Sequence, residues 1–293
     1  MSESKTLLWA GSVAVVIGAI GCGGGAASGV AIGRVAEGLP ARAQSAPRGG
    51  DLCLVQEALA SQPGGPEKPM SEACVKAFKQ DRVQRRAMIV LGAYGATLAD
   101  LGRGGDEERA GHIEAAMSPA SSGDSEDKAV DDAATQLATL LSASGKKDLE
   151  KLVQDAAASV NTICDSLVPS LDKQVRAYRD AQSDVEKKRL SKTDRRCGSI
   201  DNKSVCVSGS TADAVTYAMS YGELGVLEHD HAMAHADVAG FCAAHKKLEE
   251  AAKSGDISKD ATFDAVVEAV KSSRGGGASS PAPESKAPAA KGK

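Results

Sequence analysis

The segment CGSIDNKSVC, residues 197–206, is bounded by two cysteines and interrupts a long helix-forming stretch over residues 146–253. Two further cysteines, Cys164 and Cys242, lie at nearly equal distances on either side of this segment. Residues equidistant from the turn lie side by side in an antiparallel pair of helices. We therefore expect the chain to double back here, which brings distant cysteines together. The predicted disulfides are Cys164–Cys242 and Cys197–Cys206.

Each arm of this hairpin is predicted to be helical. In the first arm, about residues 146–194, apolar residues recur every three or four positions straight through Pro169. Because the apolar stripe is unbroken, we expect the proline to kink the helix without ending it. Charges take over at the end of the arm, in DVEKKRLSKTDRR, residues 184–196. This run is either a solvated tip or a contact surface for an anionic partner.

A second, smaller hairpin is predicted nearer the N-terminus. Residues 51–62 have the pattern of a short amphipathic helix, and a long helix is expected from Ser71 to Leu101, with Ser71 as its N-cap. Cys53 and Cys74 are equidistant from the PGGP turn between these helices. By the same argument we predict a Cys53–Cys74 disulfide.

The composition favours an all-α fold. Alanine, a strong helix former, is abundant, and alternating runs of strand-forming residues are nearly absent. The chain of 293 residues has a net charge of −4 and only 3% aromatic residues, which argues against a nucleic-acid-binding protein. We expect a disulfide-clamped antiparallel helical bundle built from two helical hairpins. A disordered N-terminal linker and a disordered C-terminal tail are predicted to flank it.

Residues 1–21 have a short polar start and then a run of mostly apolar residues that ends before Cys22. This arrangement has the length of a signal peptide. The four residues Ala19-Ile-Gly-Cys22 resemble the processing site of bacterial lipoproteins, although leucine is usual where Ala19 stands. The resemblance implies cleavage before Cys22 and attachment of lipid to its sulfur. Gly23, in place of aspartate, resembles lipoproteins that are sent to an outer membrane.

These features predict the order of segments along the chain. A signal peptide (1–21) is followed by a lipid-anchored flexible linker (22–50), a helical domain (51–273) and a disordered tail (274–293). A flexible linker of this length would span about 30 Å. Alternatively, residues 7–33 are apolar or small enough to remain uncleaved as a membrane anchor. Both interpretations give a membrane-anchored, exported domain that faces the periplasm or the exterior, and disulfides fit such a location.

Functional side chains concentrate in EHDHAMAHADVAGFCAAH, residues 228–245. Glu228, His231 and His235 share one helical face, and the hairpin places Asp172 opposite them. Such groups can bind a divalent metal ion. The same positions also belong to a seam of residues at three- and four-residue spacing, so simple packing or a pH-sensitive contact are the alternatives.

No catalytic motif in the sequence stands above background, so we do not expect an enzyme. The expected function is a non-enzymatic structural or interaction module of the cell envelope, whose partners are the membrane, through its lipid anchor, and an envelope protein. One alternative is a metal-binding protein that uses the Glu/His cluster. Another is a small-molecule sensor or carrier. We predict no cofactor apart from this possible divalent metal and no nucleic-acid partner.

Overall fold

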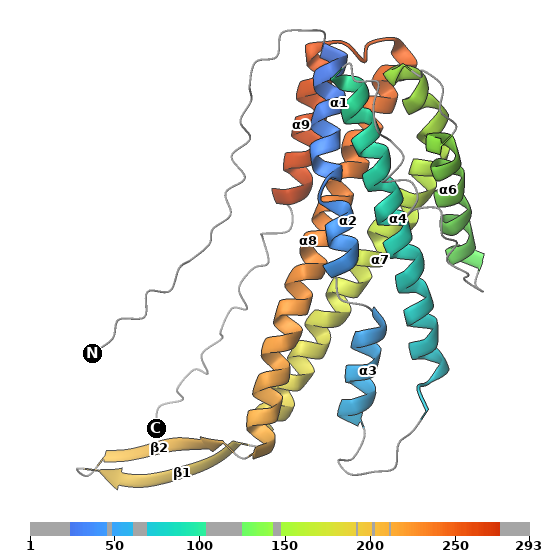
Figure 1. Cartoon of the computed structure of the whole chain (residues 1–293). Coiled ribbons are helices and arrows are strands. Elements are labelled where there is room, and N and C mark those ends of the chain that lie inside the picture. The colour runs from blue at the N-terminus through green and yellow to red at the C-terminus, as the bar shows by residue number, and fades with distance from the viewer. Residues whose placement is uncertain are drawn as a thin grey trace, which may run out of the picture.

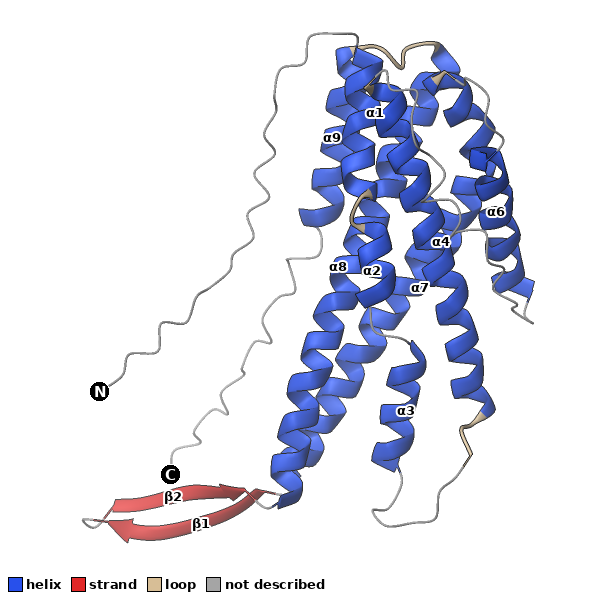
Figure 2. Cartoon of the chain, in the orientation of Figure 1, coloured by secondary structure: helices blue, strands red, loops and turns tan. Residues whose placement is uncertain are grey.

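The protein forms an elongated bundle of helices in a computed structural model (Figure 1, Figure 2). The structure describes residues 24–45, 49–60, 69–103, 125–142, 148–191, 193–200, 203–210 and 212–275. The helices are α1 (Gly24–Ala36), α2 (Leu39–Ser45), α3 (Gly49–Ala60), α4 (Glu72–Gly102), α6 (Ser125–Ser142), α7 (Leu149–Ser191), α8 (Ala212–Ser254) and α9 (Asp260–Gly275). The strands are β1 (Thr193–Ile200) and β2 (Lys203–Ser210). The expected all-α, disulfide-clamped bundle is confirmed, with one β-hairpin added to it.

Helices α7 and α8 are the two longest helices of the bundle, and they lie side by side in antiparallel directions (Figure 1). Each contains 43 residues, which corresponds to a rod of about 65 Å. Cys164 and Cys242 form a disulfide between them, as predicted, with a Cα–Cα distance of 5.8 Å. Nearer the other end, Gln182 donates a hydrogen bond to the carbonyl of Tyr221 (3.4 Å). Helix α7 continues through Pro169, as the unbroken apolar stripe predicts.

The connection between α7 and α8 is an antiparallel β-hairpin, where the sequence predicted a loop over residues 197–206. The hairpin lies at the end of the rod (Figure 1, Figure 2). In its register, the Cα of Cys197 pairs with that of Cys206. Their predicted disulfide concerns side chains outside the described part of the structure, so it stays a prediction.

The predicted flexible linker over residues 22–50 is wrong, because α1 and α2 belong to the bundle. Ile32 and Leu39 are fully buried in its core. Gly33 and Gly95 allow α1 and α4 to approach closely: a Cβ added at Gly33 would lie 2.4 Å from the Cβ of Ala99. The helical domain therefore extends over 24–275, beyond the expected 51–273. The signal peptide and nearly all of the tail lie outside the described residues.

Helices α3 and α4 form the predicted N-terminal pair. Cys53 and Cys74 are joined by a disulfide with a Cα–Cα distance of 5.3 Å, as expected. Ser71 is the N-cap of α4, and its side chain accepts a hydrogen bond from the Cys74 N–H (3.2 Å). The cap satisfies a backbone donor at the helix start. The sequence therefore predicted both the start of α4 and its covalent link to α3.

The remaining helices cover the outside of α4 and α8. Arg86 of α4 forms an ion pair with Asp131 of α6 and donates a hydrogen bond to Thr135 (3.0 Å). Helix α9 packs along α8, where Gly240 faces Val270. Within the described residues, no helix is both long enough and apolar enough to span a membrane. Because α1 packs inside the protein, the described part of residues 7–33 does not support the alternative of a membrane anchor over that range.

Candidate functional site

Glu228, His231 and His235 all lie on the side of α8 that faces α7, but each contacts a different group there. Glu228 accepts hydrogen bonds from Arg179 of α7, at 2.8 Å from Nη2 and 3.2 Å from Nε. A carboxylate held by a guanidinium is already neutralised by a strong, charge-assisted contact. Glu228 therefore serves as one half of an ion pair between the two long helices.

His231 lies in the interface between α7 and α8, with 2% of its surface exposed. Its ring stacks obliquely on that of Tyr178, with a centroid distance of 4.9 Å. Burial raises the pKa of Tyr178 further above its ordinary value. Tyr178, Val185 and Leu224 belong to a small apolar cluster near the hairpin end of the rod. His231 thus packs beside an apolar cluster and does not point into an open site.

His235 is half-buried, and burial lowers its pKa, while the negative charge of Asp172 partly opposes this shift. The predicted proximity of Asp172 and His235 across the helix pair is therefore supported by their electrostatic interaction. Asp172 also forms an ion pair with Arg176 one turn further along α7 (2.5 Å). The Asp172 carboxylate thus pairs with Arg176 on its own helix and acts on His235 through its charge.

The four side chains predicted as metal ligands do not converge on one point. In the described part of the chain, three possible ligand atoms lie within 4.8 Å of one another at Cys53, Glu57 and Cys74. The set of Glu228, His231, His235 and Asp172 does not meet this geometry. Moreover, the sulfurs of Cys53 and Cys74 are bonded to each other, so they are not the thiolates that metal ions require. The arrangement on α8 therefore favours packing over metal binding.

A buried polar pair lies further along α8 and was not singled out from the sequence. The hydroxyl of Tyr94 and Nε2 of His245 are 3.0 Å apart, and both residues are fully buried. The ring of Phe241 lies near both of theirs. Burial lowers the pKa of His245 to about 4, with the Glu249 carboxylate opposing the shift. The regular spacing of the seam indicated that His245 is interior, but its pairing with Tyr94 could be identified only from the structure.

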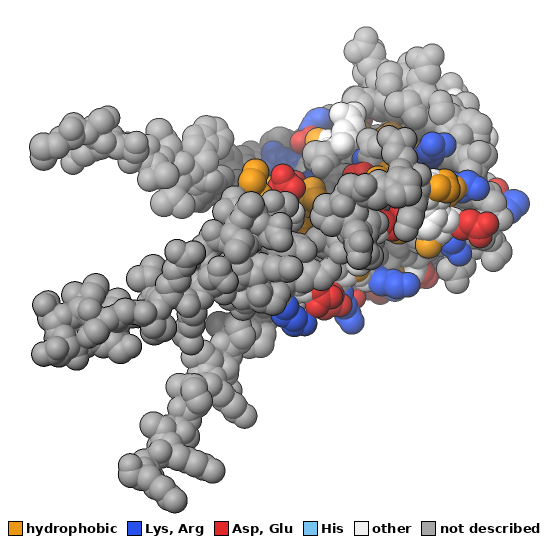
Figure 3. All heavy atoms as spheres, turned by 90° about the horizontal axis from the view of Figure 1, so that it is seen from below, with side chains coloured by type: hydrophobic (Ala, Val, Ile, Leu, Met, Phe, Trp, Pro, Cys, Tyr) orange, Lys and Arg blue, Asp and Glu red, His pale blue; other side chains and the backbone are white. Residues whose placement is uncertain are grey.

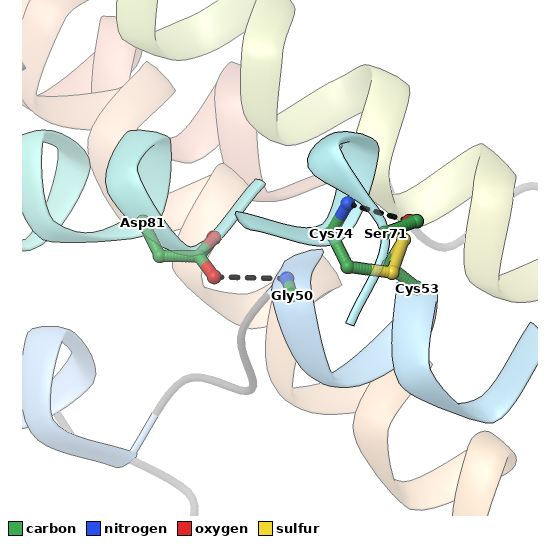
Figure 4. The surroundings of a disulfide bond; sticks show 5 residues. All are labelled: Gly50, Cys53, Ser71, Cys74 and Asp81. Atoms are coloured by element: carbon green, nitrogen blue, oxygen red, sulfur yellow. Dashed lines mark hydrogen bonds between the residues drawn. A yellow bond between two sulfur atoms is a disulfide. The ribbon is translucent and has the colours of Figure 1, made fainter. Parts of the chain in front are cut away.

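The start of α3 is held by a second buried polar group (Figure 4). Asp81 of α4 accepts hydrogen bonds from the N–H groups of Gly49 (2.8 Å) and Gly50 (2.9 Å). Burial raises the pKa of Asp81, while these two backbone donors oppose the shift. An acidic group at a helix N-terminus is favourable because it meets unpaired N–H groups and the positive end of the helix dipole. Asp81 and the Cys53–Cys74 disulfide therefore fasten α3 to α4.

The hairpin end of the rod has an unusual charge. Residues 187–210 contain seven basic residues and two acidic ones, in a chain whose net charge is −4. On the described helices viewed from this end, basic and acidic side chains are interspersed (Figure 3). The basic residues of the hairpin region were visible in the sequence, but their location at one end of the molecule follows from the fold.

Comparison with protein-family models, curated proteins and solved structures finds no match.

Proposed function

We propose that this protein is an exported, lipid-anchored component of the cell envelope whose helical domain acts as a non-enzymatic structural or interaction module. The proposal combines the lipoprotein-like segment that ends at Cys22 with the shape of the domain that follows it. One end of that domain would be attached to the membrane, facing the periplasm or the exterior, and the other would be available to an envelope partner.

The observation that carries this proposal is the position of α1. The helix begins at Gly24, two residues after Cys22, and its small residues pack against the bundle. A Cβ added at Gly29 would lie 2.6 Å from the carbonyl oxygen of Leu98 and 3.4 Å from the side chain of Leu149. Leu98 is near the end of α4 and Leu149 begins α7, so α1 starts at the end of the rod opposite the hairpin.

A lipid on Cys22 would therefore hold the domain close to the bilayer, because a single residue separates Cys22 from the start of α1 at Gly24. In one orientation, α7 and α8 extend away from the membrane and place the hairpin about 65 Å from the anchored end, at 1.5 Å per residue over 43 residues. A rigid rod of this kind suits a spacer or a protein that contacts a partner at a distance.

Two further observations support the proposal. The described residues include two disulfides, Cys53–Cys74 and Cys164–Cys242, and such bonds persist in oxidising compartments. Two of the candidate groups on α8 are engaged with α7: Glu228 pairs with Arg179, and His231 packs on Tyr178. This arrangement favours a protein that works through its outer surface.

Metabolic labelling with an alkyne-bearing fatty acid tests the proposal. The wild-type chain should incorporate the label and sediment with membranes, and Cys22→Ala should lose the label. The double variant Cys197→Ala/Cys206→Ala is the matched control, because it removes two cysteines far from the anchor and should remain labelled. An unlabelled wild-type chain, or label that persists in Cys22→Ala, would contradict the lipid anchor.

A further inference from the structure

Helices α2 and α9 cover only part of α8. Helix α9 packs on the part remote from the hairpin, where Gly240 faces Val270. Helix α2 contacts the same part, and its Arg42 forms an ion pair with Asp237 (3.1 Å). Helix α8 continues toward the hairpin beyond the ends of both α2 and α9 (Figure 1). The half of α8 nearer the hairpin is therefore the place to look for an uncovered face.

Three of the large apolar side chains that α8 exposes lie on one line along the helix. Met219 is 66% exposed, Val226 is 62% exposed and Met233 is 37% exposed. They stand at intervals of seven residues, and Gly240, which α9 covers, is the next position in the same series. A line of apolar residues at this spacing is the surface on which a second helix packs in a coiled-coil pair. The exposed apolar stripe, Met219, Val226 and Met233, thus continues a line on which α9 already packs.

An acidic residue stands four positions after each member of this stripe, on the neighbouring line of the helix surface. The three acidic residues are Glu223, Asp230 and Asp237. Asp237 is buried, and Arg42 of α2 pairs with it. Glu223 is exposed and Asp230 is half-buried, and no ion pair among the described residues includes either of them. The stripe is therefore bordered by carboxylates that repeat the Asp237 position without its basic partner.

The contact between α2 and α8 indicates which kind of segment this edge accepts. Arg42 supplies a guanidinium to the third acidic position. A helix that laid its apolar face on the stripe would bring its own edge beside the first two positions, Glu223 and Asp230. Arg or Lys on that edge would pair with the two carboxylates. Charge complementarity of this kind favours one partner over another.

A second copy of this chain matches the stripe poorly. In an antiparallel pair of α8 helices, the row of Glu223 and Asp230 would face the same acidic row of the other copy, and like charges repel. In a parallel pair, the α2 and α9 helices of the two copies would compete for the same space, since both contact α8 next to the stripe. The charges and the shape therefore favour a different helix as the occupant.

We propose that Met219, Val226 and Met233 form a docking site for a helix of an envelope partner, one with apolar residues on one face and Arg or Lys along its edge. This inference rests on the proposed function, because it names the kind of partner that the anchored module recognises. The stripe extends over about 21 Å, at 1.5 Å per residue, which corresponds to about four turns of helix. Such a short contact is a weak and reversible one.

Binding can be measured on the full chain in a non-ionic detergent, by the fluorescence anisotropy of labelled helical peptides of about three heptads. The basic probe has Leu on one face and Arg along the edge, and the acidic probe has Glu in place of Arg. We expect the basic probe to bind the wild-type chain at least about ten-fold more tightly than the acidic probe. Micelles take up each probe equally in all samples, so differences between variants report on the protein.

Val226→Glu puts a charge in the middle of the stripe and should weaken binding of the basic probe about ten-fold or more. Its matched control is Val75→Glu, because Val75 is an exposed valine on another helix, with 41% of its surface accessible. We expect Val75→Glu to change the affinity less than about two-fold, since a distant surface charge is screened. Both valines are exposed, so neither change removes a core contact.

Reversing the charge of the edge tests the choice of partner. Glu223→Lys/Asp230→Lys should make the acidic probe the tighter ligand. The matched control reverses two exposed acidic residues of α9, with Asp264→Lys/Glu268→Lys. This variant should keep the preference for the basic probe.

The proposal would be overturned if the two charge-reversed variants had the same preference, or if Val226→Glu bound the basic probe as tightly as the wild-type chain does. Self-association that Val226→Glu abolishes would assign the stripe to a second copy and overturn it. Binding that appears only after deletion of residues 276–293 would assign the stripe to that segment, with the same consequence. None of these outcomes changes the lipid content of Cys22, so the anchor stands or fails separately.

Discussion

A Cβ built on Gly95 of α4 would lie 2.1 Å from the Cβ of Ala36 on α1. Real side chains never approach so closely, so Gly95→Ala must push the two helices apart. We expect a loss of about 1–3 kcal/mol in the free energy of unfolding, measured by urea denaturation.

Gly222→Ala is the control for this change, because a Cβ there has no neighbour within 4 Å. Alanine is the better helix former, so this variant should gain up to about 1 kcal/mol. If Gly95→Ala proved as harmless as Gly222→Ala, the close packing of α1 on α4 would be wrong.

A third disulfide is expected at the hairpin. Cys197 and Cys206 are Cα partners in the register of β1 and β2, a separation that a disulfide can span. Peptide mapping without reduction should find Cys197 linked to Cys206, together with the links Cys53–Cys74 and Cys164–Cys242. A free thiol at Cys197, or its link to any other cysteine, would contradict the prediction.

Stability should depend on pH through His245. Burial lowers its pKa from 6.5 to about 4 in the folded protein, so the unfolded chain takes up a proton first as the pH falls. The stabilising contribution is complete above pH 6.5 and is lost as the pH falls through 4. We expect a decrease of about 3 kcal/mol over this interval, measured by urea unfolding at a series of pH values.

His245→Gln should flatten this pH dependence, whatever its effect on absolute stability. His235→Gln is the comparison, because burial also lowers the pKa of His235, which is only half-buried. Its effect on the slope should be smaller. An unchanged slope in His245→Gln would show that this imidazole does not titrate as a buried group.

Substitutions of two histidines on α8 distinguish a packing role from metal binding. His231 is buried against Tyr178, whereas His229 is exposed. We expect His231→Ala to cost about 2–3 kcal/mol, since it leaves a cavity at the helix interface. His229→Ala should change the free energy of unfolding by less than about 0.5 kcal/mol. Stoichiometric zinc in the purified protein that His231→Ala abolishes would restore the metal hypothesis.

The antiparallel pairing of α7 and α8 was predictable because the positions of their cysteines restrict which residues of the two helices can be neighbours. Disulfide bonds require close Cα atoms, so the equal spacing of Cys164 and Cys242 about the turn was enough to specify an antiparallel pair. The same reasoning held for Cys53 and Cys74. Spacing in the sequence thus supplied information about the tertiary structure that helical periodicity alone lacks.

The helices α1 and α2 differ from the predicted linker because a composition rich in glycine and alanine is compatible with two different structures. Glycine and alanine make a chain flexible when it has no partner, but they also let two helices approach closely. Gly33 and Gly95 serve the second purpose, since each meets the backbone or Cβ of the facing helix. Without α4 in view, the sequence of this segment resembles a linker.

The β-hairpin has a local signal in the sequence. Ile200, Val205 and Val207 are strand-forming residues on either side of Asp201-Asn202, a two-residue connection with the composition of a tight hairpin turn.

The candidate site was predictable only in part. The sequence placed Glu228, His231 and His235 on one face, but their roles depend on Arg179 and Tyr178 of the facing helix.

The most direct test of the anchored-rod proposal is the intact mass of the protein after extraction from membranes with detergent. We predict that residues 1–21 are absent and that Cys22 carries lipid, so that the folded domain begins two residues beyond the anchor. A mass that includes residues 1–21, or one that corresponds to an unmodified Cys22, would contradict the proposal.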